Sequence, residues 1–345
     1  MPTLDGVRAL AILGVLLHHT RGSPFHRLAG FRGVWLFFVL SGFLITTLAL
    51  REEDAFGEFS VRAFMIRRVF RIMPLFYLAL LTYLLWVSVL QMEPNGPLLW
   101  RYLLDYVVYC PEFPILNNAF TVPFGQAWSL GIEEKFYLAW PIVAFVWLKN
   151  TGQRLAVGLV LLGATLMLSA HTGPLSQMWG SYGDILIGCL LALTMHDRRG
   201  YEYLRTLGRR ELTYSVLLVA AVMATSRLSG THPGERIFSF ACALAIAALL
   251  TNQGTPAKLF ASPWLTRIGV WSYAIYLTHA FLFDVWNRIV PPGRVGDYLT
   301  LPLTLATDLP LCWALHSYIE TPLIRFGRSM AAQVRGSALR MPMRS

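Results

Sequence analysis

Residues 33–50 read GVWLFFVLSGFLITTLAL, a run of apolar and small residues that contains no charged side chain. A helix of about 20 apolar residues is long enough to cross the roughly 30 Å hydrocarbon layer of a bilayer. This run is therefore typical of a membrane-spanning helix, and comparable runs recur between charged residues and Pro/Gly clusters. We expect about ten spanning helices, at residues 4–23, 32–50, 73–92, 128–148, 154–171, 181–196, 212–227, 237–252, 268–289 and 298–319.

The composition of the chain indicates a protein whose solvent is the bilayer. Of its 345 residues, 55% are hydrophobic and 14% are charged, and the mean hydropathy is +0.52. Soluble proteins carry about 25% charged residues, so the polar surface needed to cover soluble domains is missing. The net charge is +10, and the basic residues lie between the apolar runs rather than on one stripe, which argues against nucleic-acid binding. The four cysteines form no CxxC pair, so neither a disulfide framework nor a metal site is predicted.

The loops between the expected spans differ in charge. One set, which includes 51–72, 196–211 and the tail after 320, holds more than twice as many Arg and Lys residues as the opposite set. By the positive-inside rule, we expect this set and both chain termini to be cytoplasmic. The sequence thus predicts an all-α, multi-pass protein of the inner (plasma) membrane, with a transmembrane domain at 1–325. Residues 326–345 are expected to form a basic, disordered cytoplasmic tail.

Two titratable side chains lie in the first expected span, Arg8 and His19. A charge at the centre of a spanning helix costs about 2.5–3.5 kcal/mol on insertion scales, so such residues indicate functional sites. Eleven helical residues return to within about 20° of the same face with a rise of about 16 Å, which puts the two on one stripe at different depths. His19 suits a general base for a hydroxyl group. The structural alternative is a histidine bonded to a neighbouring helix and an arginine anchored to phospholipid.

A second group of charges is Glu133, Glu134 and Lys135, within the stretch WSLGIEEKFY at 128–137. The uncharged run after Lys135 is too short to span a bilayer, so the helix has to begin earlier and bring these charges into the membrane. One carboxylate could then fix the tautomer of His19 and stabilise its protonated form. In the structural alternative, the charges lie at the outer interface and the lysine snorkels.

A third group is the cluster Arg67, Arg68 and Arg71. Arg68 and Arg71 are three residues apart and share a helix face, an arrangement that suits phosphate groups. Ordinary positive-inside flanking explains one or two of the three equally well.

Three further residues give weaker signals. His279 is expected in the middle of the ninth span, and Glu320 closes the tenth; both could be structural. Ser41 forms a small pair with Gly42, which more often marks a close helix contact than a catalytic serine.

Six stretches, in this order, resemble the acyltransferase-3 family of integral membrane proteins. They are 4–12 with His19, 33–43, 67–75, 128–141, 272–279 and 320–322. The resemblance runs from residue 4 to about 325, nearly the whole chain. No single motif is decisive, but six in the correct order are specific.

The resemblance implies a ten-helix O-acyltransferase that takes an acyl group, usually acetyl, from cytoplasmic acyl-coenzyme A (acyl-CoA) and holds no tightly bound cofactor. It implies an acceptor hydroxyl on a cell-surface glycan, such as O-antigen or an exopolysaccharide, or on a macrolide or other small natural product. Many members carry an extracytoplasmic hydrolase-like domain after the last helix. The sequence ends about 25 residues past Glu320, and we expect no such domain here.

The resemblance also assigns roles to residues. Those implied to hold the coenzyme's phosphates are Arg8, Arg67, Arg68 and Arg71. Those implied to be catalytic are His19, Glu133 and Glu134, with His19 acting either as the base or through a transient acyl-histidine. Further candidates within the matched motifs are Asp5, Ser41, Trp128, Ser129, Tyr137, His279 and Glu320.

Two other classes of function compete with the enzyme. In a proton-coupled transporter, the buried His and Glu residues would be proton relays, but the sequence shows no inverted halves or paired broken helices. A non-catalytic membrane scaffold would have no need for the stripe of Arg8 and His19. The expected partners are acyl-CoA, a hydroxyl acceptor and membrane lipid, and no nucleic acid. The sequence does not predict the acceptor, the acyl chain length or the oligomeric state.

Overall fold

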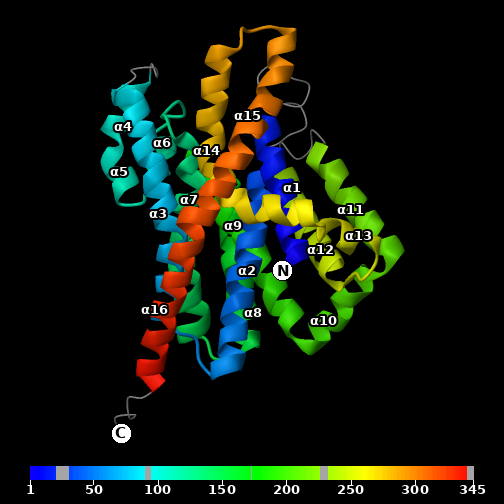
Figure 1. The fold of residues 1–345 in the computed structure, drawn as a ribbon. Coiled ribbons are helices and arrows are strands. Elements are labelled where there is room, and N and C mark those ends of the chain that lie inside the picture. Colours follow the sequence, from blue (N-terminus) through cyan, green and yellow to red (C-terminus); the bar gives the residue numbers. More distant parts are fainter. Residues whose placement is uncertain (21–30, 90–94, 172, 226–231, 340–345) are drawn as a thin grey trace.

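The computed structural model describes residues 1–20, 31–89, 95–171, 173–225 and 232–339 (Figure 1). Within these residues the chain is helical and contains no strand. The last residues of the spans expected at 4–23, 73–92 and 212–227 lie outside the described residues, as does the end of the expected tail at 340–345. The same holds for five of the cations counted for orientation: Arg21, Arg27, Arg227, Arg340 and Arg344.

Seven helices in the described residues are long and apolar enough to cross a membrane, by length and composition. They are α2 (Arg32–Phe56), α3 (Val61–Ser88), α8 (Thr151–Leu168), α9 (Pro174–His196), most of α12 (His232–Thr251), α14 (Pro263–Ile289) and a continuous helix at Val295–Gly336. The last is built from α15 (Arg294–Leu315), the π-helix η6 (His316–Glu320) and α16 (Thr321–Leu339). Their large exposed apolar side chains, as on α8, suit a lipid surround.

The other three expected spans take a different form. α1 (Pro2–His18) and α11 (Arg210–Thr225) have 17 and 16 residues, a little less than a bilayer ordinarily requires. α7 (Trp128–Pro141) gives way to the π-helix η3 (Ile142–Trp147), because Pro141 cannot continue the regular hydrogen-bond ladder. The count of ten spans therefore stays a prediction.

The remaining elements are short and connect the long helices. They are α4 (Gly96–Arg101), α5 (Leu103–Val107), α6 (Phe113–Leu116), η2 (Gly125–Ala127), α10 (Arg198–Arg205), η4 (Thr206–Gly208) and α13 (Thr255–Phe260). The first three lie between residues 96 and 116, and Pro111 lies in the break between α5 and α6.

Close contacts between small residues hold the centre of the bundle together. α1 packs against α2 and α14, and α2 packs against α9. A Cβ atom added to Gly42 would lie 1.8 Å from the carbonyl oxygen of Ile185, and one added to Gly188 would lie 1.9 Å from that of Val39. The sequence favours a close helix contact at the Ser41-Gly42 pair, and the structure shows one at Gly42.

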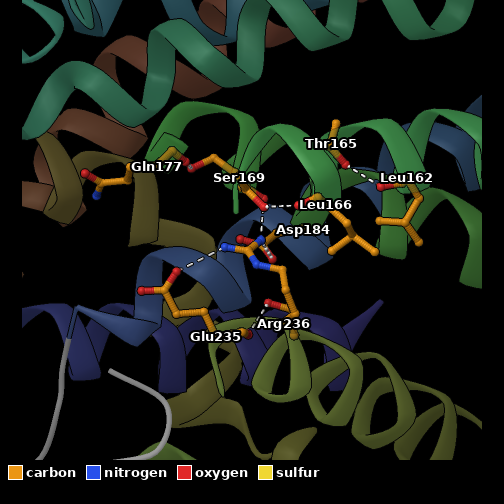
Figure 2. A network of polar contacts seen from close by, with 11 residues as sticks. Leu162, Thr165, Leu166, Ser169, Gln177, Asp184, Glu235 and Arg236 are labelled. Atoms are coloured by element: carbon orange, nitrogen blue, oxygen red, sulfur yellow. Dashed lines mark hydrogen bonds and ion pairs between the residues drawn. The ribbon is translucent and has the colours of Figure 1, made fainter. Parts of the chain in front are cut away.

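Buried ion pairs join helices that are distant in sequence. Arg236 on α12 bonds to Asp184 on α9 at 2.5 Å and to the adjacent Glu235, deep between the helices (Figure 2). Arg154 on α8 makes two bonds of 2.6 and 2.7 Å to Glu53 at the end of α2. Each pair satisfies charges that would otherwise be buried without a partner, so each fixes the register of its two helices.

The C-terminal region includes the tail expected at 326–345. Residues 326–339 continue α16 as a helix, which lies alongside α3 (Figure 1). A Cβ atom added to Gly327 would lie 2.6 Å from the side chain of Phe70, and the ring centroids of Phe70 and Phe326 are 5.1 Å apart. Basic composition reveals nothing of this packing partner on α3, and the disordered tail stays a prediction.

Candidate active site

Three cavities follow one another through the bundle and share lining residues. The basic cavity, about 370 Å³, is lined by Arg8, Arg68 and Arg71 among others. The same three arginines line the inner cavity, about 70 Å³. Val34 and Tyr276 line both the inner cavity and the histidine cavity, about 460 Å³, which contains His19. The three cavities therefore lead from an arginine cluster to a histidine, and the inner cavity between them has the smallest volume.

The arginine cluster comes from two helices that meet at the basic cavity. Arg8 lies near the start of α1, and Arg68 and Arg71 lie on one face of α3. None of the three forms an ion pair with a carboxylate in the described residues, and the guanidinium of Arg68 lies 4.1 Å from the ring centroid of Tyr137. The charges of Arg8 and Arg68 are close enough to repel that of Arg71. Unpaired cations held together in this way favour an anionic ligand.

Arg67 stands apart from this cluster although it also lines the basic cavity. It is ion-paired with Glu52, which is almost fully buried and also pairs with Arg335 on α16. Glu52 further accepts a hydrogen bond of 3.2 Å from the backbone N–H of Ser60. Arg67 and Arg335 thus share the single negative charge of Glu52, and Arg67 holds the ends of α2 and α3 together.

The charged trio of α7 divides between two environments. Glu133 and Glu134 line the inner cavity, and Glu133 accepts a 3.0 Å hydrogen bond from the hydroxyl of Tyr137. One carboxylate oxygen of Glu134 is buried without a hydrogen-bond partner in the described chain. Lys135 points elsewhere, to a 2.6 Å ion pair with Glu112 in the short-helix region.

His19 caps the end of α1 and lines the histidine cavity. Its Nδ1 lies 2.9 Å from the carbonyl oxygen of Val15. Because a carbonyl only accepts, Nδ1 has to carry the hydrogen, so Nε2 is the basic nitrogen of the neutral ring. His279, fully buried on α14, makes the same contact with Ile275 at 3.1 Å, and the two imidazole centroids are 4.7 Å apart.

Tyr276 stands between the inner and the histidine cavities. Its hydroxyl donates a 2.7 Å hydrogen bond to the carbonyl oxygen of Gln126 and accepts one of 2.7 Å from Ser129. The carboxylates of α7 therefore lie on one side of Tyr276 and His19 on the other. The sequence suggested that Glu133 or Glu134 lies beside His19, but the structure does not bring them together. The ring neighbours of His19 are His18, His279 and Phe283.

The remaining candidates fall into two groups. Ser41 and Tyr137 line the inner cavity, and Trp128 lines the histidine cavity. Asp5 and Glu320 line none of the three: Asp5 pairs with the chain's amino group at 3.5 Å, and Glu320 bonds to His316 at 2.8 Å.

Sequence reasoning did not single out Tyr276 or Gln126. Tyr276 lies in the same sequence motif as His279, and this was the only hint to it. Its position between two cavities depends on contacts with α7 and η2. In the described residues, no group of three His, Cys, Asp or Glu side chains could hold a metal ion.

A membrane-embedded helical protein in which a row of cavities joins an arginine cluster to a histidine is the class that this geometry defines. A family model described as an acyltransferase domain, acyltransferase 3, matches residues 1–316. The chain belongs to the acyltransferase-3 family.

Curated relatives carry names that agree with the family. The chain is 26% identical to the peptidoglycan O-acetyltransferase OatA of Listeria monocytogenes, over 95% of this chain and 56% of that protein. It is 30% identical to YrhL of Bacillus subtilis, provisionally named a peptidoglycan O-acetyltransferase, over 97% of this chain and 56% of that protein. A Staphylococcus aureus protein provisionally named an O-acetyltransferase is 25% identical over 95% of this chain and 58% of its own length.

The chain thus spans a little over half the length of these relatives. No solved structure matches it.

Proposed function

We propose that this protein moves an acetyl group from acetyl-CoA to a hydroxyl of a cell-surface glycan, with peptidoglycan as the first candidate. The observation that carries the proposal is the row of cavities between the unpaired arginines and His19. The names of the relatives support O-acetyl transfer and the glycan acceptor. The basic cavity is the donor's entrance and faces the cytoplasm, where acyl-CoA is made, and the protein lies in the plasma membrane.

The donor is bound by its phosphates at Arg8, Arg68 and Arg71, because these cations are unpaired and line both the basic and the inner cavities. The pantetheine arm extends through the inner cavity toward the histidine cavity. The pantetheine arm is too large for the inner cavity of about 70 Å³, so the side chain of Tyr276 has to move aside when the arm enters. Glu133 and Glu134 line this passage, and the unpartnered oxygen atom of Glu134 can accept a hydrogen bond from an amide N–H group of the arm.

His19 supplies the base in the histidine cavity. Its Nε2 removes the proton from the acceptor hydroxyl, and the hydroxyl oxygen attacks the thioester carbonyl. The new C–O bond forms, the C–S bond breaks, and the imidazolium returns the proton to the departing thiolate. A transient acyl-histidine uses the same nitrogen and the same two cavities. His279, which contacts the ring of His19 and is bonded to its own helix, holds that ring in place.

The size of the histidine cavity also suits a second acceptor class. At about 460 Å³ it lies within the range of sites that bind small molecules, roughly 300–1,000 Å³. A hydroxylated small product could therefore replace the terminal part of a glycan, with the donor site and the base unchanged.

The test uses purified protein in liposomes with labelled acetyl-CoA and a peptidoglycan fraction. His19→Ala is the test variant, and His196→Ala is the matched control, because His196 lies outside all three cavities and pairs with Asp54. We expect base-labile label on the glycan, lost in His19→Ala and kept in His196→Ala. Full activity in His19→Ala contradicts the mechanism. Label that reaches only a small-molecule acceptor favours the second class.

A further inference from the structure

α16 brings one more arginine to the basic cavity. Arg328 lines that cavity and forms no ion pair in the described part of the chain. It lies beyond residue 316, where the match to the family model ends. The family resemblance therefore says nothing of Arg328, and only the packing of α16 against α3 puts it at the donor's entrance.

The position of Arg328 is fixed by contacts on both sides of it along α16. Before it, Phe326 and Gly327 pack closely against Phe70. After it, Arg335 pairs with Glu52 and donates a 2.7 Å hydrogen bond to the carbonyl oxygen of Glu58. A side chain anchored in this way presents its charge to the cavity at a defined place, unlike an arginine on a free tail.

The arginines of the basic cavity lie at two depths. Arg8, Arg68 and Arg71 also line the inner cavity, whereas Arg67 and Arg328 line the basic cavity alone. Arg67 is ion-paired with Glu52. Arg328 is thus the unpaired cation of the shallow part, farthest from the passage to His19.

Coenzyme A carries its phosphates in the same order. The pyrophosphate joins the pantetheine arm directly, and the 3′-phosphate lies on the ribose, farther from the thioester. With the arm in the inner cavity, the pyrophosphate meets the three deep arginines. We propose that Arg328 binds the 3′-phosphate of the donor and so makes this acyltransferase selective for coenzyme A over pantetheine thioesters that lack this phosphate. This inference rests on the proposed function and adds a specificity residue to it.

The experiment compares the binding of coenzyme A with that of 3′-dephospho-coenzyme A by calorimetry. The proteins are the wild type, Arg328→Ala, Arg328→Lys and the control Arg325→Ala. Arg325 lies three residues away on the same exposed helix but does not line the basic cavity. Since a hydrogen bond to a charged group on a partly exposed site is worth about a tenfold change in affinity, we expect the wild type to prefer coenzyme A about tenfold.

In Arg328→Ala this preference should fall to about one, through weaker binding of coenzyme A alone. Arg325→Ala should keep the tenfold preference, and Arg328→Lys should keep part of it. Equal weakening of both ligands by Arg328→Ala, or an unchanged preference, overturns the inference while coenzyme A binding by the wild type still supports the proposed function. A wild type that binds neither ligand overturns the proposed function, and this inference with it.

Discussion

Substituting Gly42 by alanine tests whether the contact between α2 and α9 holds the bundle together. The added Cβ atom would lie 1.8 Å from the carbonyl oxygen of Ile185, and ordinary contact begins at 3.4 Å. The helices therefore have to separate by about 1.6 Å at this point, because a backbone carbonyl cannot move away as a side chain can. Overpacking costs about 1–3 kcal/mol, and a rigid backbone clash belongs at the upper end.

A loss of about 3 kcal/mol lowers the melting temperature of a protein of this size by about 4 °C. The assay is thermal unfolding of purified protein in detergent, followed by tryptophan fluorescence. Gly163→Ala on α8 is the matched control, since a Cβ atom there meets nothing within 4 Å. It should be neutral or slightly stabilising, by up to about 1 kcal/mol, because alanine is the better helix former.

The reciprocal glycine offers a second test of the same contact. Gly188→Ala should cost as much as Gly42→Ala, because its Cβ atom would lie 1.9 Å from the carbonyl oxygen of Val39. The double variant should cost less than the two added together, since one separation of the helices relieves both clashes. If Gly42→Ala melts at the same temperature as Gly163→Ala, the close contact does not exist and the reasoning fails.

Two further substitutions probe the donor entrance and Tyr276. Glu52→Gln removes the negative charge that is ion-paired with Arg67. Coenzyme A should then bind at least about threefold more tightly, and the melting temperature should fall by a few degrees. Weaker binding of coenzyme A in calorimetry would refute this. Tyr276→Phe leaves Ser129 and the carbonyl of Gln126 without their partner, which should lower the free energy of unfolding by about 1–2 kcal/mol. Adding Ser129→Ala should restore part of that loss, because it removes the hydroxyl group that has lost its hydrogen-bond partner. A further drop in melting temperature would count against the hydrogen bonds of Tyr276.

The sequence predicted helices well where apolar runs alone decide the structure. It placed the start of α9 at residue 181, whereas the helix begins at Pro174. The missed turns contain Gly180 and other small or polar residues, which are typical of a loop. In the structure Arg236, on a distant helix, pairs with Asp184 and bonds to the carbonyl of Gly180, which ties this part of α9 to α12. Such a partner cannot be read from local composition.

The candidate site was predictable as a set of residues but not as an arrangement. Helical spacing put Arg8 and His19 on one helix at different depths, and they line different cavities in the structure. The same spacing could not reveal that Tyr276 separates His19 from the carboxylates, or that Glu52 is ion-paired with Arg67. Both facts depend on contacts between residues far apart in the chain, which periodicity does not encode.

The narrow middle of the cavity row has a consequence for energy use. On the proposed path, neither the nucleotide nor the sugar changes compartment; only two carbon atoms and their oxygen pass from one side of the bilayer to the other. No ion gradient has to be spent, because breaking the thioester drives the passage. On that path Tyr276, which lines both cavities, would keep the membrane closed between one transfer and the next.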